Sequence, residues 1–397
     1  MSISGAARQA HIEGLDGLRG IALLMVVIAH LYLLNIGWVG MQSFFVLSGF
    51  LITRVLLMDR DRAPTFGSYL KRFYIRRLWR ILPLYYGYLA VMLVITEMNE
   101  PQREHLLYGF AYLYNFFTLR ADRVHSFQFD HLWSMSVEEQ FYLVWPFVLY
   151  WFSAVNLRRL LIGLVGLSVV LRALTWLNWP FDIAPDAQPW RPLAMYVLTW
   201  SYLDAFAIGA LINFTTLSPR PVHLLLYAAA AFLLGVAVNG IGIMPMFEGG
   251  PYLSLGWPLY MPHGWQAIWG YTVVNLFLFL LICMIINHDQ TRRLFSNRVL
   301  DYLGKRSYPC YLLHYPVLAV FLPLLPTLNE FTGHRILGTL LLALIYLPVI
   351  ILLADLCHRL IELPSIKYGR RFAPRMPNTA GVGESAEKAN PLSTGEK

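Results

Sequence analysis

The sequence predicts an all-α protein, a polytopic membrane helix bundle with about ten transmembrane helices and a short re-entrant segment near residues 105–118. Three observations predict this fold. Of the 397 residues, 57% are hydrophobic and only 14% are charged, whereas a soluble domain carries about 25% charged residues. The apolar residues gather in runs of about 20, the length of a membrane-spanning helix. Basic residues cluster between these runs, as the positive-inside rule requires.

The apolar runs give the expected order of the helices. We expect spans at about residues 18–36, 38–57, 81–97, 139–155, 157–176, 193–214, 221–240, 266–287, 309–326 and 335–358. The run 105–118 is shorter than a spanning helix and lies between His105 and Arg120. That length is typical of a re-entrant or interfacial segment.

The charges of the loops predict the orientation. Basic residues concentrate in segments 53–80 and 288–308 and after residue 366, and such clusters stay in the cytoplasm. With about ten spans, all three clusters fall on one side. We therefore expect both termini to be cytoplasmic, in a bacterial inner membrane. The loops expected outside are 98–138, 177–192, 241–265 and 327–334. Arg120 and Arg123 are an awkward basic pair in the first of these loops.

The chain divides into one large domain and two short ends. We expect a cytoplasmic N-terminal segment over 1–17, a single transmembrane domain over 18–376 and a polar, disordered cytoplasmic tail over 377–397. The net charge is +8, but no basic face of a soluble domain is indicated, so we expect membrane lipid and no nucleic acid as a partner. The three cysteines form no CxxC motif, which predicts neither a disulfide framework nor a metal site.

Two ionisable residues lie on the first expected span. Arg19 and His30 are eleven positions apart, which is close to three helical turns and about 16 Å along the axis. They therefore share one side of the helix, with Arg19 near the cytoplasm and His30 inside the membrane. An ionisable residue at this depth indicates a functional site. The alternative is a snorkelling arginine and a hydrogen-bonded core histidine.

The next two spans carry a small-residue pair and an arginine cluster. Ser48-Gly49 permits close helix packing; a nucleophilic serine would need a base in reach, which a single sequence does not reveal. Arg77 and Arg80 are i,i+3 neighbours beside Arg76. Their guanidinium groups could bind a diphosphate. The alternative is a positive-inside anchor with Trp79 in the interfacial belt.

The segment 130–141 reads DHLWSMSVEEQF. Ser136 and Glu139 have the spacing of a capping box, which predicts a helix with Ser136 as its N-cap. Glu138 and Glu139 would then lie in the first turn, where the helix dipole favours negative charge. The capping box does not explain Glu138, or His131 beside Asp130. A carboxylate at the outer mouth could orient an imidazole or bind an acceptor hydroxyl.

The remaining ionisable residues in apolar runs are Arg172, Asp204, His314 and Asp355. Asp355 and Arg359 are four positions apart and are predicted to pair. Asp204 has no local partner and is predicted to face the interior of the bundle. For His314, which several tyrosines surround in sequence, we expect core hydrogen bonding.

Taken together, these segments resemble the acyltransferase-3 family of membrane acyltransferases. The resemblance rests on GLDGLRGIALLMVVIAH, FFVLSGFLI, RRLWRILPLYY, LWSMSVEEQFYLVWP, YLDAFAIGALI, SYPCYLLHYPV and IELP. They occur in the family's order from residue 14 to residue 364, which covers nearly the whole chain. The spacing from Arg19 to His30 and the phrase SVEEQFYL are specific in combination.

The resemblance implies a function. Members of the family O-acylate sugars, lipopolysaccharide, peptidoglycan or small molecules such as macrolides, usually from acetyl-CoA or another acyl-CoA and without a metal. It implies that His30 is the catalytic histidine with Arg19 as its motif partner, and that Glu138 is the acidic residue of the motif. It implies that Arg77 and Arg80, beside Arg76, hold the CoA. Some members add an extracytoplasmic hydrolase-like domain, which this sequence lacks, so we expect no two-domain transfer.

We therefore expect a membrane O-acyltransferase that moves an acyl group, acetyl above all, from cytoplasmic acyl-CoA to a hydroxyl of a carbohydrate or small-molecule acceptor. The alternative is a transporter or exporter of an acylated or glycosylated molecule, in which intramembrane Arg, His and Asp residues would couple to protons. The lack of an internal repeat and of paired broken helices disfavours the transporter.

Overall fold

Helices make up all of the regular structure that the computed structural model describes. It describes residues 12–33, 36–95, 100–120, 122–178, 190–239 and 265–374, and no strand occurs within these ranges. This confirms the all-α class. The expected N-terminal segment 1–17 is described only from Ile12, and the expected tail 377–397 lies outside the described residues.

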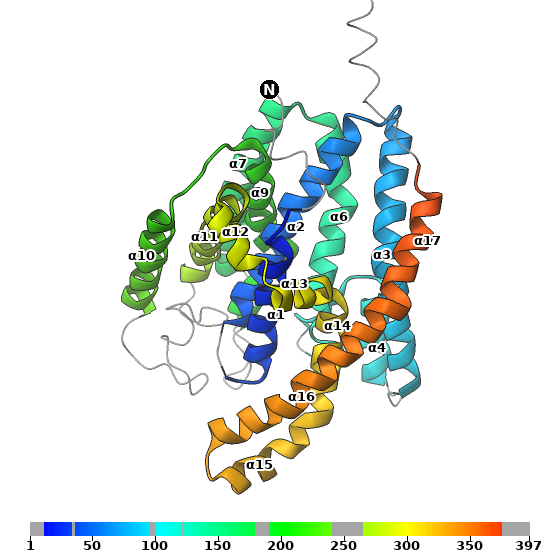
Figure 1. Cartoon of the computed structure of the whole chain (residues 1–397), viewed down its shortest axis with the longest axis vertical. Helices are drawn as coiled ribbons and strands as arrows, with labels where there is room; N and C mark the ends of the chain where they lie inside the picture. The colour runs from blue at the N-terminus through cyan, green and yellow to red at the C-terminus, as the bar shows by residue number, and fades with distance from the viewer. Residues whose placement is uncertain are drawn as a thin grey trace, which may run out of the picture.

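The helices are labelled in Figure 1, and their bounds follow in chain order. The α-helices are α1 (Leu15–His30), α2 (Gly37–Arg60), α3 (Phe66–Ile95), α4 (Glu100–Phe110), α5 (Tyr114–Phe117), α6 (Leu132–Trp151), α7 (Ala154–Asn178), α8 (Trp190–Val197), α9 (Leu203–Leu211), α10 (Pro221–Asn239), α11 (Trp265–Asn287), α12 (Asp289–Phe295), α13 (Arg298–Lys305), α14 (Ser307–Phe321), α15 (Leu325–Thr332), α16 (Arg335–Cys357) and α17 (Leu363–Phe372). Shorter turns are the 3-10 segments η2 (Thr199–Tyr202), η3 (Ile212–Phe214) and η5 (Leu322–Leu324) and the π-helical turn η6 (His358–Glu362).

Seven helical stretches in the described part of the chain are long and apolar enough to cross a membrane. They are Gly37–Arg60, Phe66–Ile95, Ala154–Asn178, Pro221–Val238, Gln266–Asn287, Ser307–Thr332 and Arg335–Phe372. Large apolar side chains such as Val94 and Phe331 are more than four-fifths exposed on the outside of the bundle (82% and 83%). Such surfaces suit lipid rather than water, and the protein is an integral membrane protein.

The other three expected spans, 18–36, 139–155 and 193–214, do not reach that length and apolar content. The helix α1 has only 16 residues, and α6 carries Glu138 and Glu139 in its interior. Residues 193–214 are divided among α8, η2, α9 and η3. Seven helical stretches of the described residues are therefore long and apolar enough to cross a membrane, whereas the sequence predicted about ten spans.

Several boundaries differ from the expected ones. The helices α3 and α6 begin at Phe66 and Leu132, well before the expected starts at 81 and 139, because helical geometry continues through polar residues beyond the apolar run. The segment 105–118 is not one helix. It comprises the end of α4, a turn at Tyr112 with a left-handed φ of 51°, and α5.

Glycines bring α2 and α9 into backbone contact. A Cβ on Gly49 would lie 2.2 Å from the carbonyl oxygen of Phe206, and one on Gly209 would lie 2.0 Å from that of Val46. Only glycine permits this approach, which is the packing mode of small residues in membrane helices. The close packing predicted for Ser48-Gly49 is confirmed at Gly49, and it fixes the face of α2 that carries Ser48.

The helix α1 is held in the same way between α2 and α13. A Cβ on Gly40 would lie 2.5 Å from the carbonyl oxygen of Ala22, and one on Gly304 would lie 1.8 Å from that of Asp16. Figure 1 shows α1 enclosed at the centre of the bundle beside α2 and α13. This packing leaves little freedom to the residues that α1 presents to the interior.

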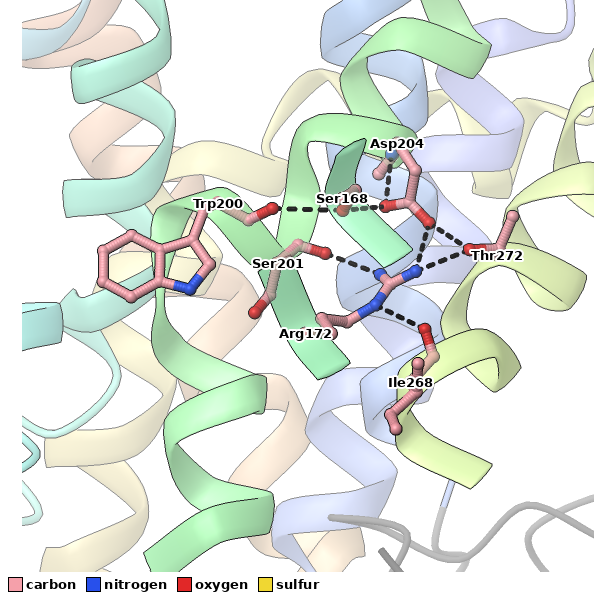
Figure 2. A network of polar contacts seen from close by, with 8 residues as sticks. Ser168, Arg172, Trp200, Ser201, Asp204, Ile268 and Thr272 are labelled. Atoms are coloured by element: carbon pink, nitrogen blue, oxygen red, sulfur yellow. Dashed lines mark hydrogen bonds and ion pairs between the residues drawn. The ribbon is translucent and has the colours of Figure 1, made fainter. Parts of the chain in front are cut away.

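A buried ion pair ties α7 to α9 and α11, as Figure 2 shows. The Arg172 guanidinium donates to the Asp204 carboxylate across 2.9 Å, and neither side chain is exposed to solvent. Arg172 also donates to Thr272 Oγ1 (2.6 Å) and to the carbonyl oxygens of Ile268 and Ser201 (2.8 Å each). Asp204 faces the interior, as predicted, and its missing partner is Arg172 from a distant part of the chain.

Asp355 confirms its predicted pairing and has a second partner. Its carboxylate contacts the guanidinium of Arg359 across 2.7 Å and that of Arg306 across 2.5 Å. The contact with Arg306 links α16 to the region between α13 and α14. These three side chains form a structural ion-pair network.

Candidate active site

His30 is the last residue of α1 and is partly buried. Its Nδ1 lies 2.8 Å from the carbonyl oxygen of Val26, one turn earlier on the same helix. A carbonyl oxygen only accepts, so Nδ1 carries the proton in the neutral ring and Nε2 keeps its lone pair. The backbone thus fixes the tautomer in which Nε2 can act as a base or nucleophile.

Two more histidines gather around His30. The ring of His314, on α14, lies 4.9 Å from that of His30, and the ring of His131, the N-cap residue of α6, lies 5.5 Å from that of His314. The Tyr315 ring is 4.7 Å from His30. Three helices thus bring three imidazoles together.

Both additional histidines bond to backbone carbonyls of α14. His131 Nε2 lies 2.9 Å from Leu312 O, and His314 Nδ1 contacts Tyr311 O. The other ring nitrogens, His131 Nδ1 and His314 Nε2, are buried without a partner among the described residues. The core hydrogen bond expected for His314 is present, but its place beside His30 was not predicted. The sequence signal was the occurrence of His314 inside a family motif and of His131 directly before one.

Glu138 lies on the opposite part of the site from His30. The Ser48 hydroxyl donates to Glu138 Oε1 across 2.6 Å, and the Tyr142 hydroxyl donates to Ser48 Oγ across 2.9 Å. Within the described residues no hydrogen bond joins Glu138 to His30. Glu138 follows His131 by two turns of α6, a rise of about 10 Å. A direct role for Glu138 in orienting the imidazole is therefore not supported by the geometry.

The capping-box prediction was wrong, because α6 begins before Ser136. The helix α6 begins at Leu132, so Glu138 and Glu139 lie in its second turn. Ser136 is buried inside the helix, where its Oγ donates to Leu132 O (3.1 Å) and accepts from Tyr114 N (3.2 Å). A serine within a helix often bonds to the carbonyl of the preceding turn, so the S-x-x-E spacing has no capping role here.

Arg77 and Arg80 approach the part of the site that contains Glu138, Ser48 and Tyr142. Their i,i+3 spacing predicted that they share a helical face. The Arg77 guanidinium lies 3.6 Å from the centre of the Tyr142 ring, a cation–π contact. Arg80 is exposed, and its charge interacts with Arg19, Arg77 and Glu362. Arg19 also forms an ion pair with Asp16 (2.9 Å). The positive charge is therefore concentrated at one end of the site.

Arg76 is placed apart from this group. Its side chain is exposed, and its charge interacts with Arg72, Asp59 and Arg370 rather than with Tyr142. One residue along a helix turns the side chain by about 100°, which directs Arg76 away from Arg77. Of the three predicted donor-binding arginines, the structure brings two together.

Tyr311 connects the two ends of the site. Its hydroxyl contacts Ser134 Oγ (2.5 Å) and donates to the carbonyl oxygen of His131 (3.1 Å), and it interacts electrostatically with Glu138. Polar side chains therefore run from Arg19, Arg77 and Arg80 through Ser48, Glu138 and Tyr311 to the three histidines. We call this arrangement the polar column.

The loop between α5 and α6 lies over the histidine end of the polar column. The Phe127 ring is 5.0 Å from that of Tyr315. Asp130 contacts Arg123 and His125 (3.0 Å to the latter) and accepts from the Tyr114 hydroxyl (2.8 Å). Burial raises the pKa of Asp130, but the His125 hydrogen bond and the Arg123 charge outweigh it and lower the pKa below its ordinary value.

These acidic partners also account for the basic pair in the expected outer loop. Arg123 pairs with Asp130, and Arg120 pairs with Asp122 (2.5 Å) and Glu104 (3.2 Å). Both arginines of the awkward basic pair therefore have acidic partners in the described part of the chain.

The described residues contain no group of three His, Cys, Asp or Glu side chains arranged to hold a metal ion. The column offers bases, hydroxyls and arginines.

Comparison with known proteins places this arrangement in context. The family model described as an acyltransferase domain matches residues 12–359, a range that contains the whole polar column. No solved structure matches the chain.

Three curated relatives match most of the chain. SACOL0978 of Staphylococcus aureus (strain COL) is 28% identical over 91% of this chain and 58% of its own length. Peptidoglycan O-acetyltransferase OatA of Listeria monocytogenes is 28% identical over 90% of this chain and 56% of its own. O-acetyltransferase OatA of Staphylococcus aureus (strain NCTC 8325 / PS 47) is 25% identical over 94% and 60%. The chain thus spans less than two thirds of these relatives.

Proposed function

The chain belongs to the acyltransferase-3 family, and from this premise we propose that it is a membrane O-acyltransferase that moves an acetyl group from acetyl-CoA to a hydroxyl of a carbohydrate acceptor. The observation that carries the proposal is the polar column, with a histidine base at one end and an arginine cluster at the other. The donor and the acceptor would meet at the histidine end.

His30 would act as the general base. Its Nδ1 is occupied by Val26 O, so Nε2 is the nitrogen that remains to take the proton of an attacking hydroxyl. A hydroxyl is a weak nucleophile toward a thioester, and a positioned base typically accelerates such a step about 10²–10⁴-fold. The released proton would pass to the thiolate of CoA as the C–S bond breaks.

Arg77 and Arg80 would hold the diphosphate of the donor. Guanidinium groups bind phosphate oxygens in pairs of charge-assisted hydrogen bonds. Arg19 lies at the same level, about 16 Å along α1 from His30. The extended arm of CoA bridges a separation of this order, which would deliver the thioester to His30. Arg76 would add positive charge at the surface and attract the anionic donor.

Ser48, Glu138 and Tyr142 would line the path of that arm. Their hydroxyl and carboxylate groups offer hydrogen-bond partners to its amide groups. Glu138 therefore keeps a place in the proposed site, as a residue that contacts the donor and not as a partner of His30. This assignment is supported by the hydrogen bonds among the three side chains.

We propose the topology that the loop charges predict. The arginine end would face the cytoplasm of a bacterial inner membrane, with both termini on that side and about ten spans in total. The helices α1 and α6 and the α8–η3 region would complete the count, and residues 105–118 would enter the membrane from the outer side without crossing it. Glycan acceptors are proposed because one relative is named for peptidoglycan.

The test is transfer by the purified protein in detergent. It is incubated with radiolabelled acetyl-CoA and a panel of sugar and small-molecule acceptors, and both labelled ester and free CoA thiol are measured. We expect thiol release that depends on the acceptor, with label on the acceptor. Binding of acetyl-CoA without release of thiol for any acceptor would contradict the proposal.

A further inference from the structure

A row of aromatic rings leads from the surface to His30. The rings of His125 and Phe127 are 5.2 Å apart, those of Phe127 and Tyr315 are 5.0 Å apart, and those of Tyr315 and His30 are 4.7 Å apart. These separations are those of rings in direct contact. The imidazole of His125 is 48% exposed, and the other three side chains are partly buried. We call this row the aromatic track.

The loop that carries the outer half of the track is held in one shape. Asp130 receives contacts from Arg123, His125 and the backbone N–H of Ser126 (3.2 Å), all within the same loop. The Tyr88 hydroxyl donates to the carbonyl oxygen of Gln128. Such bracing orders the loop before a ligand arrives, which lowers the entropic cost of binding.

The track lies at the end of the molecule away from Arg77. Tyr88 follows Arg77 by eleven residues on α3, a rise of about 16 Å. A ligand on the track would therefore approach His30 from the side opposite to the donor. This is the approach that an acceptor needs if the hydroxyl is to meet the thioester at His30 Nε2.

The chemistry of the track indicates the class of acceptor. Its side chains are rings, and two charged residues of the same loop, Arg123 and Asp130, pair with each other and are only 10% and 11% exposed. Aromatic faces bind the C–H face of a sugar ring, and a neutral surface does not select a charged group. A pyranose presents the C–H groups of one ring face together, which a flexible open-chain polyol does not.

We propose that the aromatic track is the acceptor subsite and that it selects a neutral pyranose ring, with Phe127 and Tyr315 as its specificity-determining contacts. This inference rests on the proposed function, because it names the substrate class and the residues for the same reaction. Phe127 and Tyr315 stack on the sugar ring and direct one hydroxyl to His30. They do not touch the donor.

The experiment compares acceptors with and without a pyranose ring. Wild-type protein receives radiolabelled acetyl-CoA with methyl pyranosides of glucose, galactose and N-acetylglucosamine, and with the corresponding open-chain alditols. We expect pyranosides to be preferred in kcat/KM. In Phe127→Leu and Tyr315→Leu, we expect the KM for the pyranosides to rise roughly three- to tenfold. The KM for acetyl-CoA should stay unchanged.

Two controls separate recognition from folding. Phe127→Tyr keeps an aromatic face and is expected to restore the preference for pyranosides. Phe116→Leu removes an exposed aromatic ring of the neighbouring α5, whose partner is Trp200 and which is not part of the track. That variant should retain wild-type kinetics.

The outcomes that overturn the inference are distinct from those that overturn the proposed function. Three results would refute the acceptor subsite and leave the acyltransferase intact. The wild type could use pyranosides and alditols equally, or transfer only to non-carbohydrate alcohols. The third result is a Phe127→Leu variant that keeps the wild-type preference. Absence of thiol release with every acceptor would refute the acyltransferase function itself, and the subsite with it.

Discussion

Ser48 donates a hydrogen bond to Glu138 across 2.6 Å and joins α2 to α6 in the middle of the polar column. A carboxylate at membrane depth needs partners, because burying an ionised group without them is costly. Ser48 contacts Glu138 directly. The Tyr142 hydroxyl donates to Ser48, and the Arg77 guanidinium lies over the Tyr142 ring. The Ser48–Glu138 contact places Glu138 close to Tyr142 and gives Ser48 a role beyond helix packing.

Loss of the Ser48 hydroxyl should destabilise the protein. Ser48→Ala removes a hydrogen bond to a charged group, and we expect the free energy of unfolding to fall by about 1.5–3 kcal/mol. Denaturant titration in detergent measures this change. The matched control is Ser43→Ala on the same helix, where the hydroxyl donates to Val39 O of the preceding turn. An equal, small effect of both substitutions would argue that Ser48 and Glu138 are not coupled.

Removal of the two arginines at the donor end should weaken donor binding. In Arg77→Ala with Arg80→Ala, the KM for acetyl-CoA should rise at least about tenfold, because each guanidinium supplies charge-assisted hydrogen bonds. The KM for the acceptor should change much less. Arg159→Ala removes an exposed arginine of α7 outside the column and serves as the control. Unchanged donor kinetics in the double variant would reduce Arg77 and Arg80 to topology anchors.

The buried ion pair predicts a large stability effect without a catalytic one. Arg172→Met leaves the Asp204 carboxylate buried without its cation, and we expect a loss of about 3–5 kcal/mol. Arg359→Met serves as the comparison, since Arg359 is 62% exposed beside Asp355 and such a pair contributes about 0–1 kcal/mol. Thermal unfolding of both variants checks the difference. Similar melting temperatures for the two would show that the Arg172 network does not support the fold.

Glycine contacts around α1 give a steric prediction. Gly304→Ala would place a Cβ 1.8 Å from the backbone oxygen of Asp16, so α13 must move away from α1, at a cost of about 1–3 kcal/mol. Gly163→Ala meets nothing within 4 Å and should stabilise α7 by about 0.5–1 kcal/mol. Opposite signs in the two melting shifts are expected. A neutral Gly304→Ala would mean that the α1–α13 contact is looser than the structure has it.

The sequence predicted the features that depend on composition and local pattern. Apolar runs predicted the spans α2, α7, α10 and α11 closely, and the i,i+3 spacing predicted that Arg77 and Arg80 share a face. The resemblance to a family singled out His30 as the expected catalytic histidine, and that role stays a prediction. These features need only neighbouring residues or a known motif, so one sequence suffices to find them.

Contacts between distant segments of the chain could not be predicted from one sequence. The Arg172–Asp204 pair, the Ser48–Glu138 bond and the approach of His131 and His314 to His30 each join residues from different helices. Helix packing decides these contacts, and one sequence does not reveal it. The error at Ser136 has the same origin, because the helix continues N-terminal to a pattern that elsewhere starts one.

The rate of acetyl transfer in His30→Ala tests the central claim most directly. Wild-type and variant protein are compared in detergent with radiolabelled acetyl-CoA and the acceptor that the wild type uses, with the melting temperature as a check on folding. We predict a transfer rate lower by roughly 10²–10⁴-fold in a variant that still folds and binds acetyl-CoA. A folded His30→Ala protein that transfers the acetyl group at the wild-type rate would contradict the assignment of His30 as the base.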